Sequence, residues 1–419
     1  MIIYKVKMKT SVTIMRKRNA CSIKLVQSKL AVFVLLSLMF FQLQASNESN
    51  CSIEESQLPI DFQNTLDSLQ KQFGFPGATA AYVLPDGTNG TVATGFADVE
   101  LGEKMTIQSR MLSASIGKTL VGATAVALAF EGVINLDDSL SHWLSNRQWF
   151  MHLPNYNKIT IRHLLTHSSG LPDHVYQIEF AKALSQKWYD QGNPFSPEDL
   201  VRFILDLPPL FESGKGWAYS DTGYILLGLV IEEATNKNVF DVIAERFLIP
   251  FNLTLTTPSN SRCLQNLSAG YTTKDNRFGL PVKTTSLSAE MLWHPGFEWT
   301  GGGFISNSKE LAQWGWTLYA GKAMQYPYLE ELLKAVSISR ETNEIQYGAG
   351  VAIYRNSPLG NVYGHSGWIP GYCSSLRYYA DYGIAIAFQI NTDIGIIDSP
   401  TQVLHEMEIK LAEIVIKNN

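Results

Sequence analysis

Strand-like segments at both ends of the chain enclose a long helical middle, and this arrangement restricts the possible folds more than any other feature. ATAAYVL and TVATGFADV flank the turn residues 85–87 and predict a β-hairpin. After about residue 300, GAGVAIYR, NVYGHSG, SLRYYA and GIAIAFQIN are short, rich in β-branched and aromatic residues, and separated by turns. We therefore expect an α+β fold: an antiparallel sheet built from both chain ends and flanked by helices, with a mainly helical part inserted.

Several segments show helical signals. DFQNTLDSLQKQF repeats large apolar residues at helical spacing. SPEDLVRFILDLPP has Ser196 as N-cap, Pro197 at the first helical position and a proline pair as its stop. GYILLGLVIEEATNK is apolar on most sides, which predicts a buried helix. A last helix is expected with Ser399 as cap and Pro400 behind it.

The first 45 residues have the pattern of an export signal. They hold eight Lys and Arg and no acid, followed by an apolar run from Leu30 to Leu43 and the small residue Ala45. At 14 residues the run is shorter than the roughly 20 that a membrane-spanning helix needs. We expect an exported protein, periplasmic or extracellular, with residues 1–45 as a signal peptide, or as an anchor if uncleaved, and residues 46–58 as a flexible tail.

Charge and cysteine content exclude several functions. Without residues 1–45 the chain carries 25 Lys and Arg against 38 acids, a net charge of −13, which gives no electrostatic basis for binding nucleic acid or an anionic membrane. Cys51, Cys263 and Cys373 remain, so at most one disulfide forms, and its pairing is left open. No Cys or His cluster has zinc-ligand spacing.

Ser115 and Lys118 lie three residues apart in SASIGK, ahead of the apolar run LVGATAVALAF. On a helix such a pair shares one face, so the amine can reach the hydroxyl. A neighbouring base or cation turns a serine into a usable nucleophile, and a helix start adds free N–H groups. The alternative is a polar helix start, because S-x-x-K alone recurs by chance.

Two further motifs contain groups that suit acyl chemistry. In GWAYSDTGYILLG, Tyr219 precedes a buried helix; it is either a packing residue or, beside a lysine whose charge lowers the phenol pKa, a base. YGHSGWIPGY places His365 at the end of a predicted strand. Gly367 there would admit a substrate backbone, and N–H groups at the strand edge would face a developing oxyanion.

Two other stretches are interpreted as architectural. HLLTHSSGLPDH ends a helix, and His167 in it is expected to hold a turn through hydrogen bonds. TGGGFISNSKELAQW has three glycines, Gly301 to Gly303, before a strand-to-helix switch. No phosphate-loop lysine follows them, which argues against nucleotide binding.

In this order, S-x-x-K, Y-S-D-T-G-Y and H-S-G, with HLLTHSSGLP between the first two, resemble the serine β-lactamase-related family. The similarity is to the branch that contains class C β-lactamases, DD-peptidases and esterases, and it spans about residues 60 to 415. It implies one β-lactamase/transpeptidase-like domain over residues 59–417. The α/β part would comprise 59–112 and 300–417, the helical part 113–299, with the active site in the cleft between them.

The resemblance also implies roles for individual residues. Ser115 becomes the acylated nucleophile, Lys118 its partner, and Tyr219 the general base or proton shuttle. The residues implied to bind substrate or to form the oxyanion hole with the Ser115 N–H are Asp221, His365, Ser366, Gly367 and Trp368. The implied reaction is acylation followed by hydrolysis of an amide or ester bond in a small molecule or peptide, with no metal and no cofactor.

The chain departs from the family pattern at two positions. Asp221 stands where the family usually has asparagine; an ionised aspartate only accepts hydrogen bonds. If it faces Lys118 it should hold that lysine charged, which favours Tyr219 as the base, and it repels substrate carboxylates. His365 replaces a lysine of the β-lactamases and is mostly neutral near pH 7, so attraction for a penicillin carboxylate is weaker.

Several functions remain open on the sequence alone. The leading interpretation is a serine hydrolase that cleaves amides or esters. A D-Ala-D-Ala carboxypeptidase or a β-lactamase proper is the alternative within the same chemistry. A catalytically weak sensor or binding protein, or a structural protein, is the alternative of another class.

Overall fold

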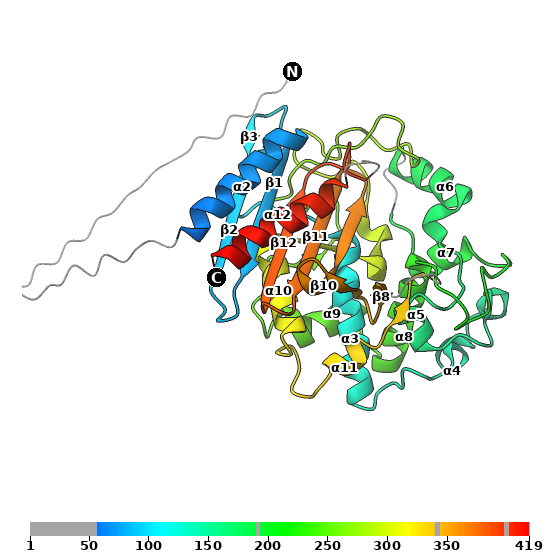
Figure 1. The fold of residues 1–419 in the computed structure, drawn as a ribbon. Coiled ribbons are helices and arrows are strands. Elements are labelled where there is room, and N and C mark those ends of the chain that lie inside the picture. The colour runs from blue at the N-terminus through cyan, green and yellow to red at the C-terminus, as the bar shows by residue number, and fades with distance from the viewer. Residues whose placement is uncertain (1–56, 190–192, 340–343, 398–401, 419) are drawn as a thin grey trace, which may run out of the picture. The chain divides into compact units, whose positions relative to one another are not determined.

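The structure is a computed structural model that describes residues 57–189, 193–339, 344–397 and 402–418 (Figure 1). The predicted signal peptide, most of the predicted tail and the predicted Ser399 cap lie outside the described residues. The described residues, from Gln57 onward, form one compact unit. Within the ranges above, no helix combines the length and apolar character needed to cross a bilayer.

A nine-stranded sheet in the order β3-β2-β1-β12-β11-β10-β9-β8-β7 forms the centre of this unit. The chain start supplies β1 (Gly77–Val83), β2 (Asn89–Asp98) and β3 (Glu103–Lys104). The chain end supplies β7 (Val336–Ser337), β8 (Ile345–Tyr347), β9 (Ala352–Ser357), β10 (Gly360–Ile369), β11 (Tyr372–Tyr379) and β12 (Ile384–Ile390). The two sets join where β1 pairs antiparallel with β12, Ala78 opposite Ile390. The predicted α+β class with an antiparallel sheet from both chain ends is confirmed.

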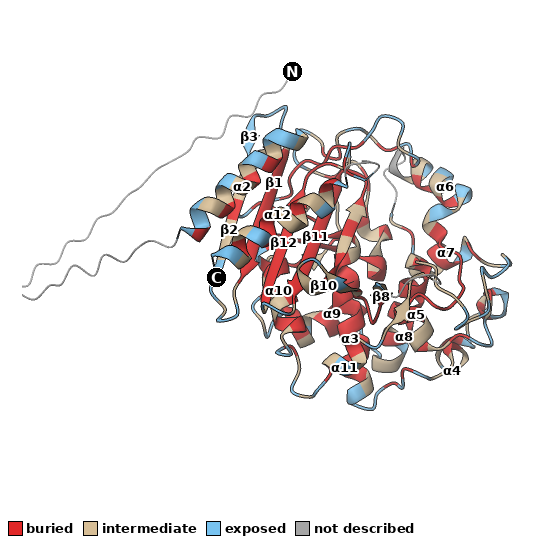
Figure 2. Ribbon diagram, viewed as in Figure 1, coloured by how far each residue is buried: buried red, intermediate tan, exposed pale blue. Residues whose placement is uncertain are grey.

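Helices cover both faces of this sheet. Helices α2 (Leu58–Phe73) and α12 (Val403–Lys417) lie side by side on one face, and α10 (Ser308–Tyr319) packs on the other (Figure 1). Strands β1, β11 and β12 are buried along their whole length (Figure 2). Burial on both faces favours apolar residues along the whole strand, which explains why GATAAYV and IAIAFQI show no regular alternation of apolar and polar residues.

The middle of the chain supplies most of the remaining helices. They are α3 (Lys118–Phe130), α4 (Leu140–Leu144), α5 (Ile161–Leu165), α6 (Ile178–Tyr189), α7 (Pro197–Arg202), α8 (Asp221–Thr235) and α9 (Val239–Ile243). Ser196 caps α7 as predicted, but the helix ends at Arg202, before the proline pair, because the chain turns and reaches a left-handed residue at Asp206 (φ 59°). A second sheet contains β4 (Met111–Leu112), β6 (Phe304–Ser306) and β5 (Thr257–Pro258); α11 (Leu329–Leu332) precedes β7.

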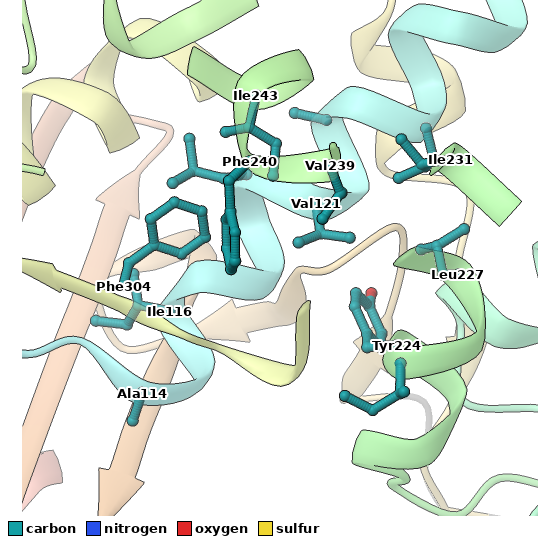
Figure 3. Close-up of a cluster of buried hydrophobic side chains, with 14 of the residues drawn as sticks. Ala114, Ile116, Val121, Tyr224, Leu227, Ile231, Val239, Phe240, Ile243 and Phe304 are labelled. Atoms are coloured by element: carbon teal, nitrogen blue, oxygen red, sulfur yellow. The ribbon is translucent and has the colours of Figure 1, made fainter. Parts of the chain in front are cut away.

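An apolar cluster fixes the elements that carry the predicted site. Figure 3 shows Ile116 of the 3₁₀ turn η1 (Ala114–Gly117) and Val121 of α3 near Tyr224 of α8 and Phe304 of β6. All four side chains are at most 1% exposed. Burial of apolar surface is the main favourable term in folding, so η1, α3 and the start of α8 are held by the core itself.

A buried ion pair ties α12 to the sheet, and its loss should be measurable. Arg377 Nη2 of β11 lies 3.0 Å from Glu408 Oε1 of α12, and these side chains are 5% and 12% exposed. Removing one partner of a buried pair costs about 3–5 kcal/mol. Glu408→Gln is expected to lower the free energy of unfolding by about 3 kcal/mol in urea denaturation followed by circular dichroism. Glu413→Gln, exposed on the same helix, is the control; equal midpoints for both variants would contradict the prediction.

Candidate active site

The structure brings Ser115 and Lys118 into hydrogen-bond contact. Ser115 lies in η1 and Lys118 is the first residue of α3; the Lys118 Nζ donates to the Ser115 Oγ at 3.0 Å. Ser115 is in the first turn, where backbone N–H groups have no partner within the helix. Ala114 before it has a φ of 48°, in the left-handed region that alanine rarely adopts. The turn therefore presents the hydroxyl on a backbone that the surrounding structure constrains.

Lys118 is fully buried and bonded to three acceptors. Besides Ser115, its Nζ contacts Asp221 Oδ1 and the carbonyl oxygen of Gly301. An ammonium has three donors, so these partners use all of them. A buried cation needs a counter-charge, and Asp221, 22% exposed at the start of α8, supplies it. Gly301, which the sequence suggested was only architectural, thus contributes its backbone to the site.

Tyr219 lies close to Lys118, but its pKa is shifted in the opposite direction to the predicted one. Its ring centroid is 4.9 Å from Lys118 Nζ. Burial raises the pKa of Tyr219 well above its usual value, and the charge of Asp221 raises it further. The expectation that a lysine would lower the phenol pKa is therefore wrong, since desolvation and Asp221 outweigh that effect. The hydroxyl has no partner in hydrogen-bonding geometry among the described residues, although Ser115 is near enough to lower its pKa.

His167 holds the loop that carries Tyr219. Its Nδ1 accepts from the Ser220 N–H at 3.2 Å, its carbonyl accepts from the Ala218 N–H at 3.0 Å, and its ring centroid is 4.2 Å from that of Tyr219. Burial lowers the pKa of His167 well below its usual value, so the ring is neutral and can accept. The geometry agrees with the turn-holding role expected from the sequence.

The β10 edge presents His365 to the pocket. His365 Nε2 is 2.8 Å from the Tyr347 hydroxyl and Nδ1 is 2.6 Å from the Ser366 carbonyl oxygen. Burial, with a contribution from the Lys118 charge, lowers the pKa of His365 to about 3, so the ring is neutral. Strand β10 pairs with β9 only as far as Gly364, whereas β11 pairs with it to Ile369. The backbone of residues 365–369 therefore pairs with a strand on one side only.

Gly367 lines the pocket and also has a packing role that the sequence did not predict. A Cβ there would lie 2.3 Å from both the Ser113 carbonyl oxygen and the Ser374 Oγ. On the side where a Cβ would stand, the space is therefore filled by protein. The small size of Gly367 lets β10 lie against the chain that leads into Ser115.

Gly367→Ala should therefore damage stability and activity together. We expect a loss of about 1–3 kcal/mol in the free energy of unfolding, because the added methyl overpacks the contact, and reduced turnover, because the turn before Ser115 must shift. Gly223→Ala in α8 is the control, since its Cβ would meet nothing closer than 3.7 Å. Thermal unfolding and ester hydrolysis are measured on both; wild-type values for Gly367→Ala would contradict the prediction.

The side chains of Ser366 and Trp368 are engaged elsewhere. Ser366 Oγ accepts from Arg377 at 2.6 Å, and Trp368 Nε1 donates to Asp393 at 3.1 Å. Both residues line the pocket, so the hydrogen bonds that they offer a substrate come chiefly from their backbone. A Trp368 N–H role in an oxyanion hole stays a prediction.

These groups surround a cavity of about 280 Å³. The polar residues that line it include Ser115, Tyr219, Asp221 and His365, and the apolar and aromatic ones include Val175, Tyr176, Phe278, Phe297, Trp368 and Ile369. Two further acids line it, Asp173 and Glu298. The sequence analysis missed both: each is a single acid in a loop, and only the adjoining HSSGLP motif offered a signal for Asp173.

Both missed acids have a raised pKa. Burial, with the charge of Asp221, raises the pKa of Asp173 to about 7. Burial raises the pKa of Glu298 to about 8, with Lys118 opposing and Asp221 adding to the shift. The pocket therefore holds three carboxyl groups, of which only Asp221 contacts a cation.

The sequence analysis also considered metal binding and disulfides. Among the described residues, no group of three or more His, Cys, Asp or Glu is placed to hold a metal ion. Cys263 is exposed and Cys373 buried, and both are free thiols; Cys51 lies outside the described residues.

The helix-and-sheet fold, with a serine bonded to a buried lysine, defines a serine hydrolase. The chain belongs to the beta-lactamase family, whose family model, described as Beta-lactamase, matches residues 62–400. This confirms the resemblance drawn from the motifs, and it makes the protein an enzyme.

Among curated relatives, penicillin-binding protein 4* of Bacillus subtilis (strain 168) is 25% identical over 342 residues, which are 79% of this chain and 71% of that protein. Protein flp of Staphylococcus aureus (strain COL) is 28% identical over 218 residues. That match covers 48% of this chain and 39% of protein flp, so it spans less than half of that relative.

Solved structures share the fold over nearly their whole length. A D-stereospecific amidohydrolase from Streptomyces sp. has a TM-score of 0.70 and 26% identity, with 83% of this chain and 98% of that chain covered. The D-amino acid amidase of Ochrobactrum anthropi SV3, complexed with D-phenylalanine, has a TM-score of 0.73 and 22% identity, with 87% and 100% covered.

Proposed function

We propose that this chain is an exported hydrolase that cleaves amide or ester bonds through an acyl-enzyme on Ser115, activated by Lys118 and Tyr219. One observation carries the proposal: Lys118 Nζ donates to Ser115 Oγ at 3.0 Å while lying 4.9 Å from the Tyr219 ring. Export rests on the basic and apolar pattern of residues 1–45.

The proposed chemistry assigns each group one task. Ser115 Oγ attacks the carbonyl carbon, and Lys118, kept charged by Asp221, stabilises the developing alkoxide. A neutral Tyr219 phenol takes the Ser115 proton as its own proton passes to the leaving group, so no free phenolate forms. Water then hydrolyses the ester by the reverse relay. The oxyanion would be bound by the N–H groups of Ser115 and Trp368.

The pocket chemistry favours amides over β-lactams. Its lining contains three carboxyl groups and neither lysine nor arginine, and His365 is neutral. Such a pocket attracts a penicillin or peptide carboxylate weakly. The similar D-stereospecific amidohydrolase, at 26% identity, supports an amidase. The relative named penicillin-binding protein 4* keeps a D-Ala-D-Ala carboxypeptidase as the second candidate.

The test combines a covalent probe with a substrate panel. Purified protein is treated with a fluorophosphonate, and peptide mapping locates the adduct, which we expect on Ser115. The panel contains amino acid amides, short p-nitrophenyl esters, nitrocefin and a D-Ala-D-Ala peptide; turnover of amides and esters is expected. Absence of both adduct and turnover would favour a binding or sensory protein. Fractionation of cells that produce the full chain tests export, and cytoplasmic retention would contradict it.

A further inference from the structure

We propose that Asp173 and Glu298 form an ammonium-binding subsite beside Ser115, which selects amides whose acyl part carries a free α-amine and an apolar side chain. This inference rests on the proposed function and specifies its substrate class.

Unpaired acceptors are the first observation. Asp173 is 5% exposed; its Oδ1 accepts from the Val175 N–H at 3.0 Å, while its Oδ2 is buried and has no partner in hydrogen-bonding geometry among the described residues, although the Asp221 N–H is near enough to lower the pKa of this carboxyl. Glu298 Oε2 is also buried and also lacks a partner there. Buried polar atoms without partners are rare and costly. Two of them in the lining of one pocket point to a ligand that donates hydrogen bonds.

Charge is the second observation. Asp221 already contacts Lys118, whose three donors are in use, so that ammonium has none left for Asp173 or Glu298. The pocket lining contains no other fixed cation. Arg277 does not line it; its Nη2 donates to the Val175 carbonyl at 2.8 Å, and its guanidinium lies 4.9 Å from the Tyr176 ring. A bound ammonium would supply both the missing charge and the missing donors.

Position is the third observation. Asp173, Glu298 and Ser115 line the same cavity, so both carboxyls are in the pocket where the attack takes place. An ammonium held there belongs near the scissile carbonyl, at the α position. The lining also includes aromatic and aliphatic residues, Phe278 and Phe297 among them. At about 280 Å³ the cavity is just below the roughly 300–1,000 Å³ usual for small-molecule sites, which suits one amino acid residue.

A matched pair of amides tests the subsite. Both enantiomers of phenylalaninamide are compared with 3-phenylpropanamide, which lacks only the amine, on wild type, Asp173→Asn and Glu298→Gln. Wild type should prefer the amine by at least 100-fold in kcat/KM for one enantiomer. Each variant should reduce that preference at least tenfold, mainly through KM. Glu330→Gln, exposed on α11, is the control and should change nothing. A preference that survives in both folded variants overturns the proposal.

A binding measurement separates this proposal from the catalytic one. Calorimetry with 2-phenylethylamine and its neutral analogue 2-phenylethanol needs no turnover. The amine should bind at least tenfold more tightly, and more tightly at pH 8 than at pH 6, because the carboxyls lose protons over that interval while an alkylamine stays charged. Equal binding of both compounds overturns the subsite even if Ser115 is acylated. Tight amine binding without acylation of Ser115 overturns the proposed function alone.

Discussion

Ser115→Ala and Lys118→Met are each expected to lower kcat/KM for an amide by roughly 10⁴–10⁶-fold, and the double variant by no more than either alone. The reason is geometric: the Lys118 Nζ acts on the reaction through the Ser115 Oγ, which it contacts at 3.0 Å. Without the hydroxyl there is no alkoxide to stabilise; without the ammonium the hydroxyl stays a weak nucleophile. Groups that act as one unit show such non-additive losses.

Amide turnover by the two single variants and the double variant measures this coupling, and the rate at which a fluorophosphonate phosphonylates Ser115 in wild type and Lys118→Met is the second readout. Thermal unfolding must accompany it, because Lys118→Met leaves Asp221 and the Gly301 carbonyl without their shared donor. Losses that multiply in the double variant would show that Lys118 acts independently of Ser115, for example by binding substrate.

Local patterns account for the part of the fold that was predicted. The β1–β2 hairpin follows from the turn at residues 85–87, and Ser196 caps α7 through a reciprocal bond pattern visible in its sequence. The place where α7 ends was mispredicted, because the stop is made by the turn to Asp206 rather than by proline.

The residues of the site also fall into those that the sequence predicts and those that it does not. Ser115 and Lys118 were predictable because their spacing places them on one face of a helix start and because Y-S-D-T-G-Y and H-S-G follow them in the order of the family. The Gly301 carbonyl, Asp173 and Glu298 reach the pocket only through tertiary packing, and a carbonyl has no sequence signature. The ionisation of Tyr219 was mispredicted because burial and the Asp221 charge depend on the folded surroundings.

Asp221 links the two departures from the family pattern. As a carboxylate it neutralises Lys118, so the lysine offers no attraction to a substrate anion. His365, neutral in its buried position, offers none either. With Asp173 and Glu298 added, the pocket is acidic where a β-lactam-binding site needs a cation. We therefore expect the substrates of this enzyme to differ from those of β-lactamases first in charge and only then in shape.

Tyr219→Phe is expected to separate amide from ester hydrolysis. General acid–base groups contribute roughly 10²–10⁴-fold, and we expect an amide to lose that factor because its amine must be protonated as it leaves. A p-nitrophenyl ester should lose less than the amide, because p-nitrophenolate departs without a proton and only the removal of the Ser115 proton is impaired. The substitution keeps the ring that packs 4.2 Å from His167 and removes a buried hydroxyl that has no partner in hydrogen-bonding geometry among the described residues.

Because the lost hydroxyl is unsatisfied, Tyr219→Phe should unfold at the same temperature as wild type or slightly above it, which makes the kinetic comparison clean. Steady-state rates with phenylalaninamide and p-nitrophenyl acetate, taken on one preparation, give the ratio of the two losses. His167→Phe is the contrasting variant: it deprives the Ser220 N–H of its acceptor, displaces the loop and should slow both substrates alike. Equal losses on amide and ester in Tyr219→Phe would mean that the phenol does not protonate the leaving group, and the proposed proton transfer from Tyr219 to that group would have to be abandoned.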